Sequence, residues 1–564
     1  MKFLSSQIRR RFVLQLVAFG VFMNGLILVG TTLLEQVFNR SNPARISSAV
    51  SSLPLLLGLT LIYLATLLKR RKYAAWLVAL PVYGLLLGLE LSRTVVSLDH
   101  HHLTMPGFVR AVAIPIVVVS GLLGYRKEFN VKSDIRNFTL AARTSALVLI
   151  IALAYGVAGF MVMDIHDFHQ EISLGEAFHR TIDQLDITTR NQLVPYTARS
   201  KLFLDSLSIL SSGAVAYAFI SLFQPLRARL TDQTKNRQLM EELLETHNAS
   251  SEDYFKLWPH DKIYFFNWKH TAGLAYHVSR GVALVVGDPA GKHADFDNLM
   301  EEFGELCRVN DWLPAFIHTE PKFKHLYQKH GLDSQKIGEE AIVHLDDFQK
   351  KVADQKYFRQ IRNKFTKQRI AAEMLTPPHS PAVLERLRVV SDEWLRLPGR
   401  SERGFMMGYF SKTYVQQCPV MVLRDDAGTI QAFINQIPSF DKPEANYDML
   451  RYTEQAPTNS NDFLLMSFID YLISHGFERL NLGLCPLAGL GEDENERTVI
   501  DSALQFVYSN GDRFYSFSGL QRFKSKYEPL WEDRYIAYKG GLRGFTRSLT
   551  ALNRTMDKTT HTDR

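Results

Sequence analysis

Hydrophobic and polar positions divide the chain into two parts of different character. Residues 1–225 contain long apolar runs, whereas the remainder mixes apolar and charged residues in the manner of a soluble enzyme. An apolar helix needs roughly 20 residues to cross a bilayer. Stretches of about this length occur at 13–34, 48–68, 73–92, 107–124, 144–163 and 203–224. The pattern predicts an α-helical polytopic membrane domain of about six helices over residues 1–225.

Basic residues between these stretches predict an orientation. They gather at Arg9–Arg11, at Lys69–Lys72, between residues 126 and 143, and at Arg227 with Arg229. With six spans, all four groups lie on one side of the membrane, and the positive-inside rule makes that side the cytoplasm. Both termini are therefore expected in the cytoplasm. A cleaved signal peptide is the weaker interpretation of the first span, because no small-x-small cleavage site is evident and further spans follow.

The second part of the chain predicts a charged linker helix over 226–250 and then an α/β region. Strand-like runs occur at 263–268, 274–278, 282–286, 314–318, 420–423, 431–436, 447–451 and 479–482. Helical periodicity predicts helices at 294–309 and 461–475. Because strands and helices alternate twice, we expect two similar α/β lobes, at 251–350 and 351–545. A polar, loosely held tail is expected at 546–564.

Composition narrows the class of protein. Hydrophobic residues make up 46% and charged residues 22% of the 564 residues, which excludes a disordered or fibrous chain. The net charge of +7 permits nucleic acid or an anionic membrane as a partner without requiring either. The three cysteines, Cys307, Cys418 and Cys485, form no CxxC pair, so a disulfide framework or a structural zinc site is not expected. A reducing compartment fits this cysteine usage.

A basic segment at 356–369, KYFRQIRNKFTKQR, predicts an amphipathic helix. Phe358, Ile361 and Phe365 have the spacing of one helical face. The basic residues of the segment are Lys356, Arg359, Arg362, Lys364, Lys367 and Arg369. Such an array suits a phosphate backbone or anionic lipid headgroups. A merely solvated helix face is an equally open interpretation.

Further charged residues lie at or near predicted strand ends. Asp448 and Arg451 end one strand, Asn481 precedes Gly483 at the end of another, and Glu402 precedes a turn at Gly408. Near the C-terminus the cations Arg522, Lys524 and Lys526 alternate with other residues, and an extended chain would place them on one side. Taken alone, these residues fit a structural ion pair and solvated lysines.

The order and spacing of several segments resemble the bacterial phosphatidylglycerol aminoacyltransferases, the multiple peptide resistance factor family. The segments are FQPLR at 223–227, GDPAG at 287–291, IGEEAIVHL at 337–345, SDEWL at 391–395, ERGFMMGYF at 402–410, DMLRY at 448–452, NLGLCPLAGLG at 481–491, FYSFSGLQRFKSKYEP at 514–529 and WEDRY at 531–535. Two segments depart from the family pattern. The usual Asp-Leu-Met-Arg is Asp448-Met449-Leu450-Arg451, which keeps both charged ends. The usual Gly-Leu-Arg ends in Gln521, which removes one cation.

The resemblance implies two acetyltransferase-like (GNAT-like) lobes on a membrane domain, and transfer of an aminoacyl group from aminoacyl-tRNA to phosphatidylglycerol. It implies catalytic roles for Asp448, Arg451, Lys524, Lys526 and Glu402, and substrate contacts for Tyr452, Arg522 and Asn481. Asp448 would orient the substrate α-amine, and Arg451 would hold a phosphate or anchor Asp448. Lys524 or Lys526 would stabilise negative charge, Glu402 would bind the amine, and the basic helix would bind the tRNA acceptor arm. No metal or organic cofactor is expected, because the ester is already activated.

The resemblance leaves several points open. Lysine, alanine and arginine are all transferred in such families, and lysine is preferred here only as the commonest. The chain is expected to be a short form without the full flippase module, located in the bacterial cell membrane with its catalytic part in the cytoplasm. A homo-oligomer is possible, and the cationic product would give resistance to cationic antimicrobial peptides. The alternatives are another lipid or cell-wall acceptor, a flippase with a regulatory soluble half, and an inactive lipid- or tRNA-binding module.

Overall fold

The computed structural model describes residues 2–38, 53–97, 114–131, 135–163, 165–168, 172–185, 196–221, 233–247, 250–441, 443–486, 488–489 and 517–557. The chain forms two compact units. One comprises Met1–Leu226 with Val309–Asp311, and the other comprises Arg227–Arg308 with Trp312–Arg564. We call them the membrane unit and the soluble unit, and describe each by itself.

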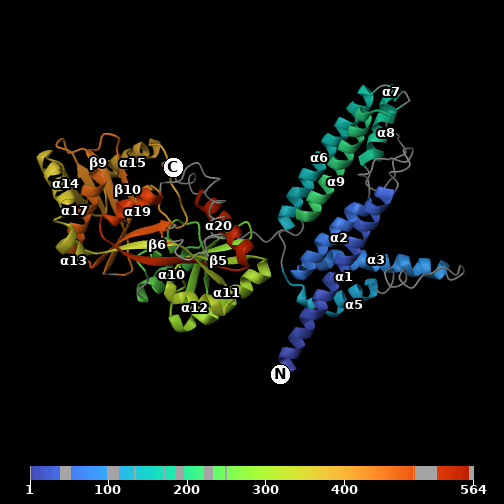
Figure 1. Cartoon of the computed structure of the whole chain (residues 1–564), viewed down its shortest axis with the longest axis horizontal. Helices are drawn as coiled ribbons and strands as arrows, with labels where there is room; N and C mark the ends of the chain where they lie inside the picture. The colour runs from blue at the N-terminus through green and yellow to red at the C-terminus, as the bar shows by residue number, and fades with distance from the viewer. Residues whose placement is uncertain are drawn as a thin grey trace. The chain divides into compact units, whose positions relative to one another are not determined.

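The membrane unit is built from helices (Figure 1). They are α1 (Lys2–Phe38), α2 (Leu53–Lys69), α3 (Tyr73–Ser97), α5 (Ile114–Gly124), α6 (Ile135–Val162), α7 (Ile165–Phe168), α8 (Leu174–Leu185) and α9 (Ala198–Ser221). Among the described residues, Phe12–Gly30, Arg143–Val162 and Ala198–Ser221 are long and apolar enough to cross a membrane. Shorter apolar helices lie at Gly58–Lys69, Tyr73–Gly84 and Ile114–Gly124. Each coincides with a predicted apolar stretch, so the apolar helical domain is confirmed, while six crossings and their orientation stay predictions.

Small residues let two of these helices approach closely. A Cβ on Gly25 of α1 would lie 2.6 Å from the carbonyl oxygen of Gly58 on α2, and a Cβ on Gly58 would lie 2.9 Å from that of Gly25. Such glycine contacts are typical of helices that associate in a bilayer. Large apolar side chains point outward elsewhere, as at Ile150, which is 63% exposed. An outward apolar surface suits a lipid environment.

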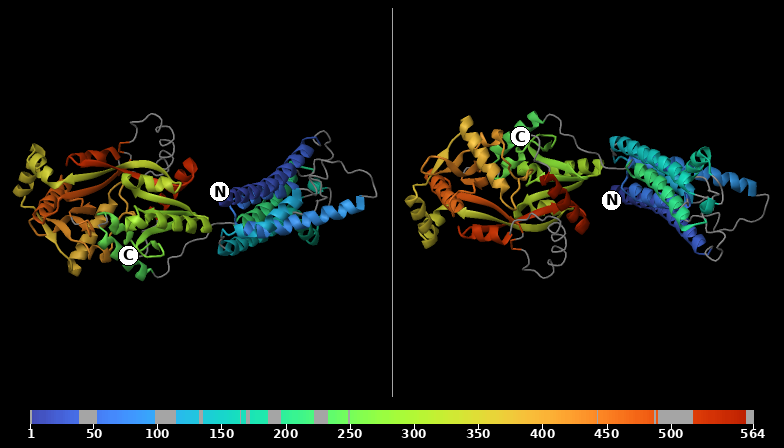
Figure 2. Two further views of the ribbon diagram at one scale, coloured as in Figure 1. Left: turned by 90° about the horizontal axis from the view of Figure 1, so that it is seen from below. Right: turned by 90° about the horizontal axis from the view of Figure 1, so that it is seen from above.

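The soluble unit has a mixed sheet with helices on both faces (Figure 2). Its strands are β1 (Ile263–Phe266), β2 (Ala272–Ser279), β3 (Val282–Val286), β4 (Ala290–Gly291), β5 (Leu313–Thr319), β6 (Asp333–His344), β7 (Ala371–Leu375), β8 (Val420–Arg424), β9 (Ile430–Ile437), β10 (Glu444–Tyr452), β11 (Arg479–Pro486) and β12 (Leu530–Tyr538). The described strands follow the order β1-β2-β3-β5-β12-β6-β11-β10-β9-β8-β7, and β4 pairs with β2.

The helices of this unit cover the sheet through alternating apolar side chains. They include α10 (Thr234–Thr246), α11 (Phe296–Asn310), α12 (Lys324–Lys329), α13 (Leu345–Asp347), α14 (Lys356–Lys367), α15 (Pro381–Arg396), α16 (Lys412–Val415), α17 (Ser460–Ser474), α19 (Phe517–Ser525) and α20 (Gly541–Asp557). Val282, Leu284 and Val286 of β3 pack in one core with α15 and α20, whereas Ala283 and Val285 pack in another with α11. Successive strand residues face opposite sides of a sheet, so each helical layer has its own core.

Most predicted elements are present, with two corrections. Residues 517–525 form helix α19 rather than an extended segment, so Arg522 and Lys524 do not lie on one side of a strand. Residues 546–557 belong to helix α20, whose Leu549 and Ala551 are buried, so this part of the predicted tail is firmly packed. Its apolar residues recur at helical spacing, which the polar composition of the segment conceals.

The predicted linker region contains a packed helix, and the two predicted lobes share one sheet. Helix α10 lies within the predicted 226–250 and buries Met240, Leu243 and Leu244. Strands β6, β7 and β12 were not anticipated, and β12 lies between β5 and β6. One continuous sheet therefore runs through residues on both sides of position 350, and the proposed lobe boundary stays a prediction.

Two β-α-β units organise the sheet. Strands β3 and β5 flank α11 and pair in parallel from Val282↔Leu313 to Val286↔Ile317. Strands β10 and β11 flank α17 and pair in parallel only from Glu444↔Arg479 to Asn446↔Asn481. Beyond Asn446 and Asn481 the two strands part: β10 stays paired with β9, and β11 stays paired with β6. Open α/β sheets bind ligands outside the carboxyl ends of parallel strands, which marks both places as candidate sites.

Candidate functional site

Asp448 lies just beyond the point where β10 and β11 part. The register of β10 against β9 shifts between Tyr447 and Leu450, and Asn435 Oδ1 accepts a hydrogen bond from the displaced Met449 N at 2.7 Å. Such a β-bulge re-aims a side chain out of the normal alternation. Asp448 Oδ1 accepts a hydrogen bond from Gly408 N at 3.0 Å, and its Oδ2 accepts one from the Tyr414 hydroxyl at 3.1 Å.

The environment of Asp448 opposes its ionisation. Burial raises the pKa of Asp448, while the hydrogen bonds from Gly408 and Tyr414 and the charge of Arg451 act in the lowering direction. Burial dominates because a charge loses its hydration in a low-dielectric site. The two hydrogen bonds hold the carboxyl in place, and its raised pKa makes it a stronger base than an exposed aspartate.

Arg451 and Glu402 form a buried ion pair beside Asp448. Arg451 Nη1 lies 2.8 Å from Glu402 Oε1, with 5% and 7% of the two side chains exposed. Glu402 Oε1 also accepts a hydrogen bond from Phe410 N at 2.8 Å, and Arg451 also donates to the Ser391 hydroxyl. The pair therefore fastens the segment that presents Gly408 to Asp448. The two roles predicted for Arg451, holding a phosphate and anchoring Asp448, both stay predictions.

Lys524 contacts β11, the other of the two parted strands. Its Nζ donates hydrogen bonds to the carbonyl oxygens of Gly483 at 2.7 Å and Leu484 at 3.1 Å. Gly483 has φ +80°, which favours glycine, and its N–H donates to Asn481 Oδ1 at 2.7 Å. Burial lowers the pKa of Lys524, whose side chain is almost fully enclosed. Asn481 thus shapes the β11 backbone that holds Lys524.

Lys526, Arg522 and Tyr452 lie in different surroundings. Lys526 Nζ pairs with Asp462 at 3.1 Å and donates to the Tyr357 hydroxyl at 2.9 Å, at the start of α17 and α14. Arg522 is exposed, and the Tyr452 hydroxyl lies 3.5 Å from Arg400. Lys524 and Lys526, two positions apart, therefore belong to different networks, and of the two Lys524 is the one that donates to the backbone of β11.

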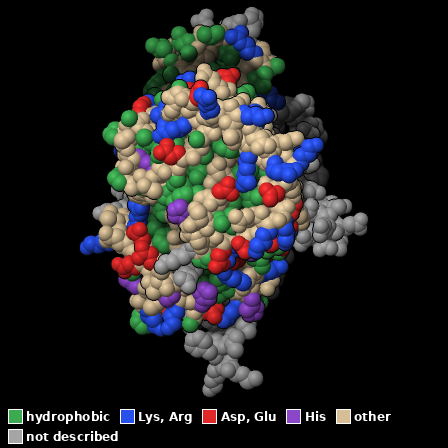
Figure 3. All heavy atoms as spheres, turned by 90° about the vertical axis from the view of Figure 1, so that its left-hand side faces the viewer, with side chains coloured by type: hydrophobic (Ala, Val, Ile, Leu, Met, Phe, Trp, Pro, Cys, Tyr) green, Lys and Arg blue, Asp and Glu red, His purple; other side chains and the backbone are tan. Residues whose placement is uncertain are grey.

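The basic segment forms the predicted helix, α14. Phe358, Ile361 and Phe365 are its buried face. Arg362 pairs with Asp470, and Lys364 donates to the Thr458 carbonyl oxygen. The other cations, Lys356, Arg359, Lys367 and Arg369, are exposed and form no ion pair within the described part of the chain. Figure 3 shows the side of the soluble unit that carries α14, with Lys and Arg side chains spread over it.

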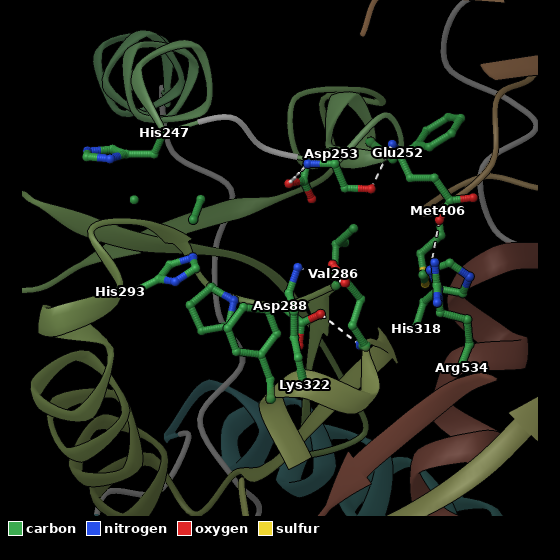
Figure 4. Close-up of a pocket in the computed structure, with 18 residues that line it drawn as sticks. His247, Glu252, Asp253, Val286, Asp288, His293, His318, Lys322, Met406 and Arg534 are labelled. Carbon is green, nitrogen blue, oxygen red and sulfur yellow. Dashed lines mark hydrogen bonds and ion pairs between the residues drawn. The ribbon is translucent and has the colours of Figure 1, made fainter. Parts of the chain in front are cut away.

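A second polar site was not anticipated from the sequence. It is a pocket at the carboxyl ends of β3 and β5, lined among others by Glu252, Asp288, His318 and Arg534 (Figure 4). His318 Nδ1 lies 2.8 Å from Glu252 Oε2, and His318 Nε2 lies 3.6 Å from Glu340 Oε1. Glu252, His318 and Glu340 have the donor types of a metal site, but Arg534 already pairs with Glu340. GDPAG, IGEEAIVHL and WEDRY contain three of these residues, Asp288, Glu340 and Arg534, and were the available signals.

Comparison with known proteins identifies the family. The family described as "Phosphatidylglycerol lysyltransferase, C-terminal" matches residues 241–538. The chain belongs to this family. Curated phosphatidylglycerol lysyltransferases include one from Bacillus subtilis (strain 168), 32% identical over 279 residues, which are 50% of this chain and 32% of the relative. Another, from Staphylococcus aureus (strain MRSA252), is 28% identical over 327 residues, 58% of this chain and 38% of the relative. The match thus spans only about a third of these phosphatidylglycerol lysyltransferases.

Solved structures support the α/β fold of the soluble unit. "The structure of L-PGS from Bacillus licheniformis" has 30% identity and a TM-score of 0.52, covering 57% of this chain and 97% of that chain. A C-terminal domain of a putative lysylphosphatidylglycerol synthetase from Agrobacterium fabrum has 28% identity and a TM-score of 0.52, covering 58% and 99%. Membership of the phosphatidylglycerol lysyltransferase family therefore concerns the unit that contains Asp448 and Lys524.

Proposed function

We propose that the chain transfers an aminoacyl group, most simply lysyl, from aminoacyl-tRNA to the glycerol headgroup of phosphatidylglycerol. The observation that carries the proposal is the pair of groups at the parted strands, Asp448 on β10 and Lys524 beside β11. They lie within the segment that matches the family, 241–538. The names of the relatives supply the substrates, and the residues supply a site for the reaction.

The reaction exchanges one ester for another. A glycerol hydroxyl attacks the carbonyl carbon of the aminoacyl ester, a new carbon–oxygen bond forms, and the bond to the terminal ribose of tRNA breaks. The hydroxyl proton finally resides on the released ribose oxygen. Such a reaction needs a group that manages the proton and a cation or donor near the developing oxyanion. In this proposal Asp448 orients the amine or shares its proton, and Lys524 stabilises the oxyanion.

Supporting residues hold these two groups. The Arg451–Glu402 pair fixes the segment that carries Gly408, and Asn481 fixes the backbone to which Lys524 binds. Within this proposal Arg451, Glu402 and Asn481 are positioning residues. Lys526 belongs with the helix α14 network rather than with the reacting atoms, because it binds Asp462 and Tyr357.

Different parts of the chain would bind the two substrates, tRNA and lipid. The exposed cations of α14 suit the phosphates of a tRNA acceptor arm, because such contacts depend on positive charge rather than base sequence. The apolar N-terminal helices indicate membrane anchoring, which would keep the enzyme at its lipid substrate. A cytoplasmic soluble unit in a bacterial membrane would give access to aminoacyl-tRNA. A cationic product would lower the negative surface potential that attracts cationic peptides.

Transfer in a purified system tests this proposal. The full chain is reconstituted in vesicles containing phosphatidylglycerol, and radiolabelled lysyl-tRNA is added. We expect label in the lipid extract with the native chain and at least a hundredfold less with Asp448→Asn. Asp297→Asn, an exposed carboxylate paired with Lys329, is the matched control and should retain activity. Equal transfer by Asp448→Asn, or label only in another lipid, would contradict the proposal.

A further inference from the structure

The short helix α8 packs alongside α6 and α9, whose apolar segments are long enough to cross a membrane (Figure 1). The two longer helices are antiparallel. The Ser145 hydroxyl of α6 donates to the Ala214 carbonyl oxygen of α9 at 2.7 Å. Further along, a Cβ on Gly159 of α6 would clash with the Phe203 ring of α9. The C-terminal end of the α6 segment therefore lies beside the N-terminal end of the α9 segment, and the two helices form a hairpin.

Helix α8 runs along this hairpin from its end towards its middle. A Cβ on Gly156 would clash with Thr181 of α8, so the two helices touch six residues before the end of the α6 segment. Gln184 Nε2 donates to the Ser208 hydroxyl at 2.8 Å, ten residues after the start of the α9 segment. A helix rises about 1.5 Å per residue, so these contacts lie about 9 and 15 Å inside the segments. The hydrocarbon core is about 30 Å thick, so α8 reaches the level of its middle.

The exposed surface of α8 divides into an apolar and a polar face. The apolar face consists of Leu174, Phe178 and Ile182, which recur every four residues and are 64%, 45% and 43% exposed. Residues with this spacing lie on one side of a helix. The polar face carries exposed charged or ionisable side chains, namely Glu176, His179 and Asp183. The remaining face is buried against the hairpin, so α8 presents two different surfaces to its surroundings.

The apolar face of α8 continues an apolar surface that the hairpin already turns outward. At the same level along the hairpin, Met161 of α6 and Leu202 of α9 are 50% and 71% exposed within the two apolar segments. Such an outward surface suits acyl chains rather than water. An amphipathic helix lying flat on a membrane enters only about 5–10 Å, and it would not bring Gln184 to Ser208. The direction of α8 therefore favours insertion along the hairpin over a position on the membrane surface.

We propose that α8 is a re-entrant helix, which enters the bilayer from one side and ends near its middle. Its apolar face contacts lipid acyl chains, and its polar face lines a water-filled recess that opens on the side from which α8 enters. Ionisable side chains at membrane depth face a cavity or the protein interior, because exposure to hydrocarbon is costly. The Gln184 amide is satisfied within the protein by Ser208 and by the Leu204 carbonyl oxygen, as such a depth requires.

Spin labels on single added cysteines test this position. The full chain is placed in vesicles of phosphatidylcholine and phosphatidylglycerol, and each label is exposed to oxygen, which enters hydrocarbon, or to a water-soluble nickel chelate. We expect oxygen to dominate at Leu174→Cys, Phe178→Cys and Ile182→Cys, with a depth that increases along this series by up to about 12 Å. Ile150→Cys, near the middle of the α6 segment, is the hydrocarbon reference. His179→Cys, next to Phe178 but on the polar face, should favour the nickel chelate.

Matched variants control the packing of α8 on the hairpin. Gly156→Leu fills the space that Thr181 occupies and should make the Ile182→Cys label shallower. Gly213→Leu should leave that depth unchanged, because a Cβ at Gly213 of α9 would meet nothing within 4 Å. The three native cysteines are buried, so the chain without an added cysteine measures background labelling.

Three results would overturn the inference. Nickel access at Phe178→Cys and Ile182→Cys equal to that at His179→Cys would place α8 in water. Equal depths along the series from Leu174 to Ile182 would show a helix lying flat on the membrane. Exclusion of both reagents, with spin–spin broadening that disappears on dilution with unlabelled chain, would place a second copy of the chain against the apolar face.

Discussion

Replacing Gly408 with alanine probes the geometry of the Asp448 centre with a single methyl group. A Cβ at Gly408 would lie 1.7 Å from Asp448 Oδ2 and 2.8 Å from Asp448 Cγ and Tyr414 Cε1. The carboxylate oxygen must retreat by about 1.5 Å to reach an ordinary contact distance. The hydrogen bonds from Gly408 N at 3.0 Å and the Tyr414 hydroxyl at 3.1 Å cannot both survive such a shift.

The expected losses follow from that displacement. A catalytic group misplaced by about 1 Å costs on the order of a hundredfold in rate, so we expect kcat/KM for lipid aminoacylation to fall by about that factor. Overpacking in a filled site costs about 1–3 kcal/mol of unfolding free energy. The Gly408→Ala chain should nevertheless bind tRNA as the native chain does, because α14 is untouched.

The assay combines transfer kinetics in phosphatidylglycerol vesicles with urea unfolding. Gly304→Ala is the matched control, since its Cβ would meet nothing within 4 Å in helix α11. Alanine there should leave activity unchanged and add up to about 1 kcal/mol of stability through helix propensity. Native activity in Gly408→Ala would refute the assignment of Asp448 to the reaction centre, because its carboxylate cannot keep its present position.

Three further changes have distinct readouts. Combining Arg359→Gln with Lys367→Gln should raise the KM for aminoacyl-tRNA and flatten its salt dependence by about one unit of slope per lost phosphate contact. An unchanged slope would exclude α14 from tRNA binding. Glu402→Gln leaves the Arg451 charge buried without its partner and should cost about 3–5 kcal/mol in urea unfolding. Burial raises the pKa of Asp288 to about 7, above the unfolded value of 3.8. The contribution of the protonated Asp288 to the free energy of unfolding is therefore complete below pH 3.8. It is lost as the pH rises towards 7, by up to about 4 kcal/mol. Asp288→Asn should lack this loss, and parallel thermal-unfolding curves of the two chains across pH would contradict it.

Local periodicity predicted much of the fold. Apolar helices and strands such as Val282–Val286 follow from patterns within one segment. Strand β12 was missed because its place between β5 and β6 depends on residues about 200 positions earlier in the sequence. Helix α19 was missed because alternating cations fit a strand as well as a helix, and the packing of Tyr527 and Lys524 decides between them.

The candidate site was predictable only where a motif carried it. Asp448 and Lys524 came from the family resemblance, and the register of β10 and β11 supplies the reason they flank one place. The cluster of Glu252, His318 and Glu340 comes from three separate segments, and of these only the segment of Glu340, IGEEAIVHL, belongs to a motif that the sequence analysis recognised. No spacing rule joins such residues before the sheet is known.

The most direct test of aminoacyl transfer to phosphatidylglycerol is mass spectrometry of lipids from a host that lacks this activity. The host expresses either the native chain or Asp448→Ala, with equal amounts verified in the membrane fraction. The account predicts a new aminoacylated phosphatidylglycerol with the native chain alone, and its mass identifies the amino acid. The same lipid from Asp448→Ala, or an unchanged lipid profile from the membrane-inserted native chain, would contradict it.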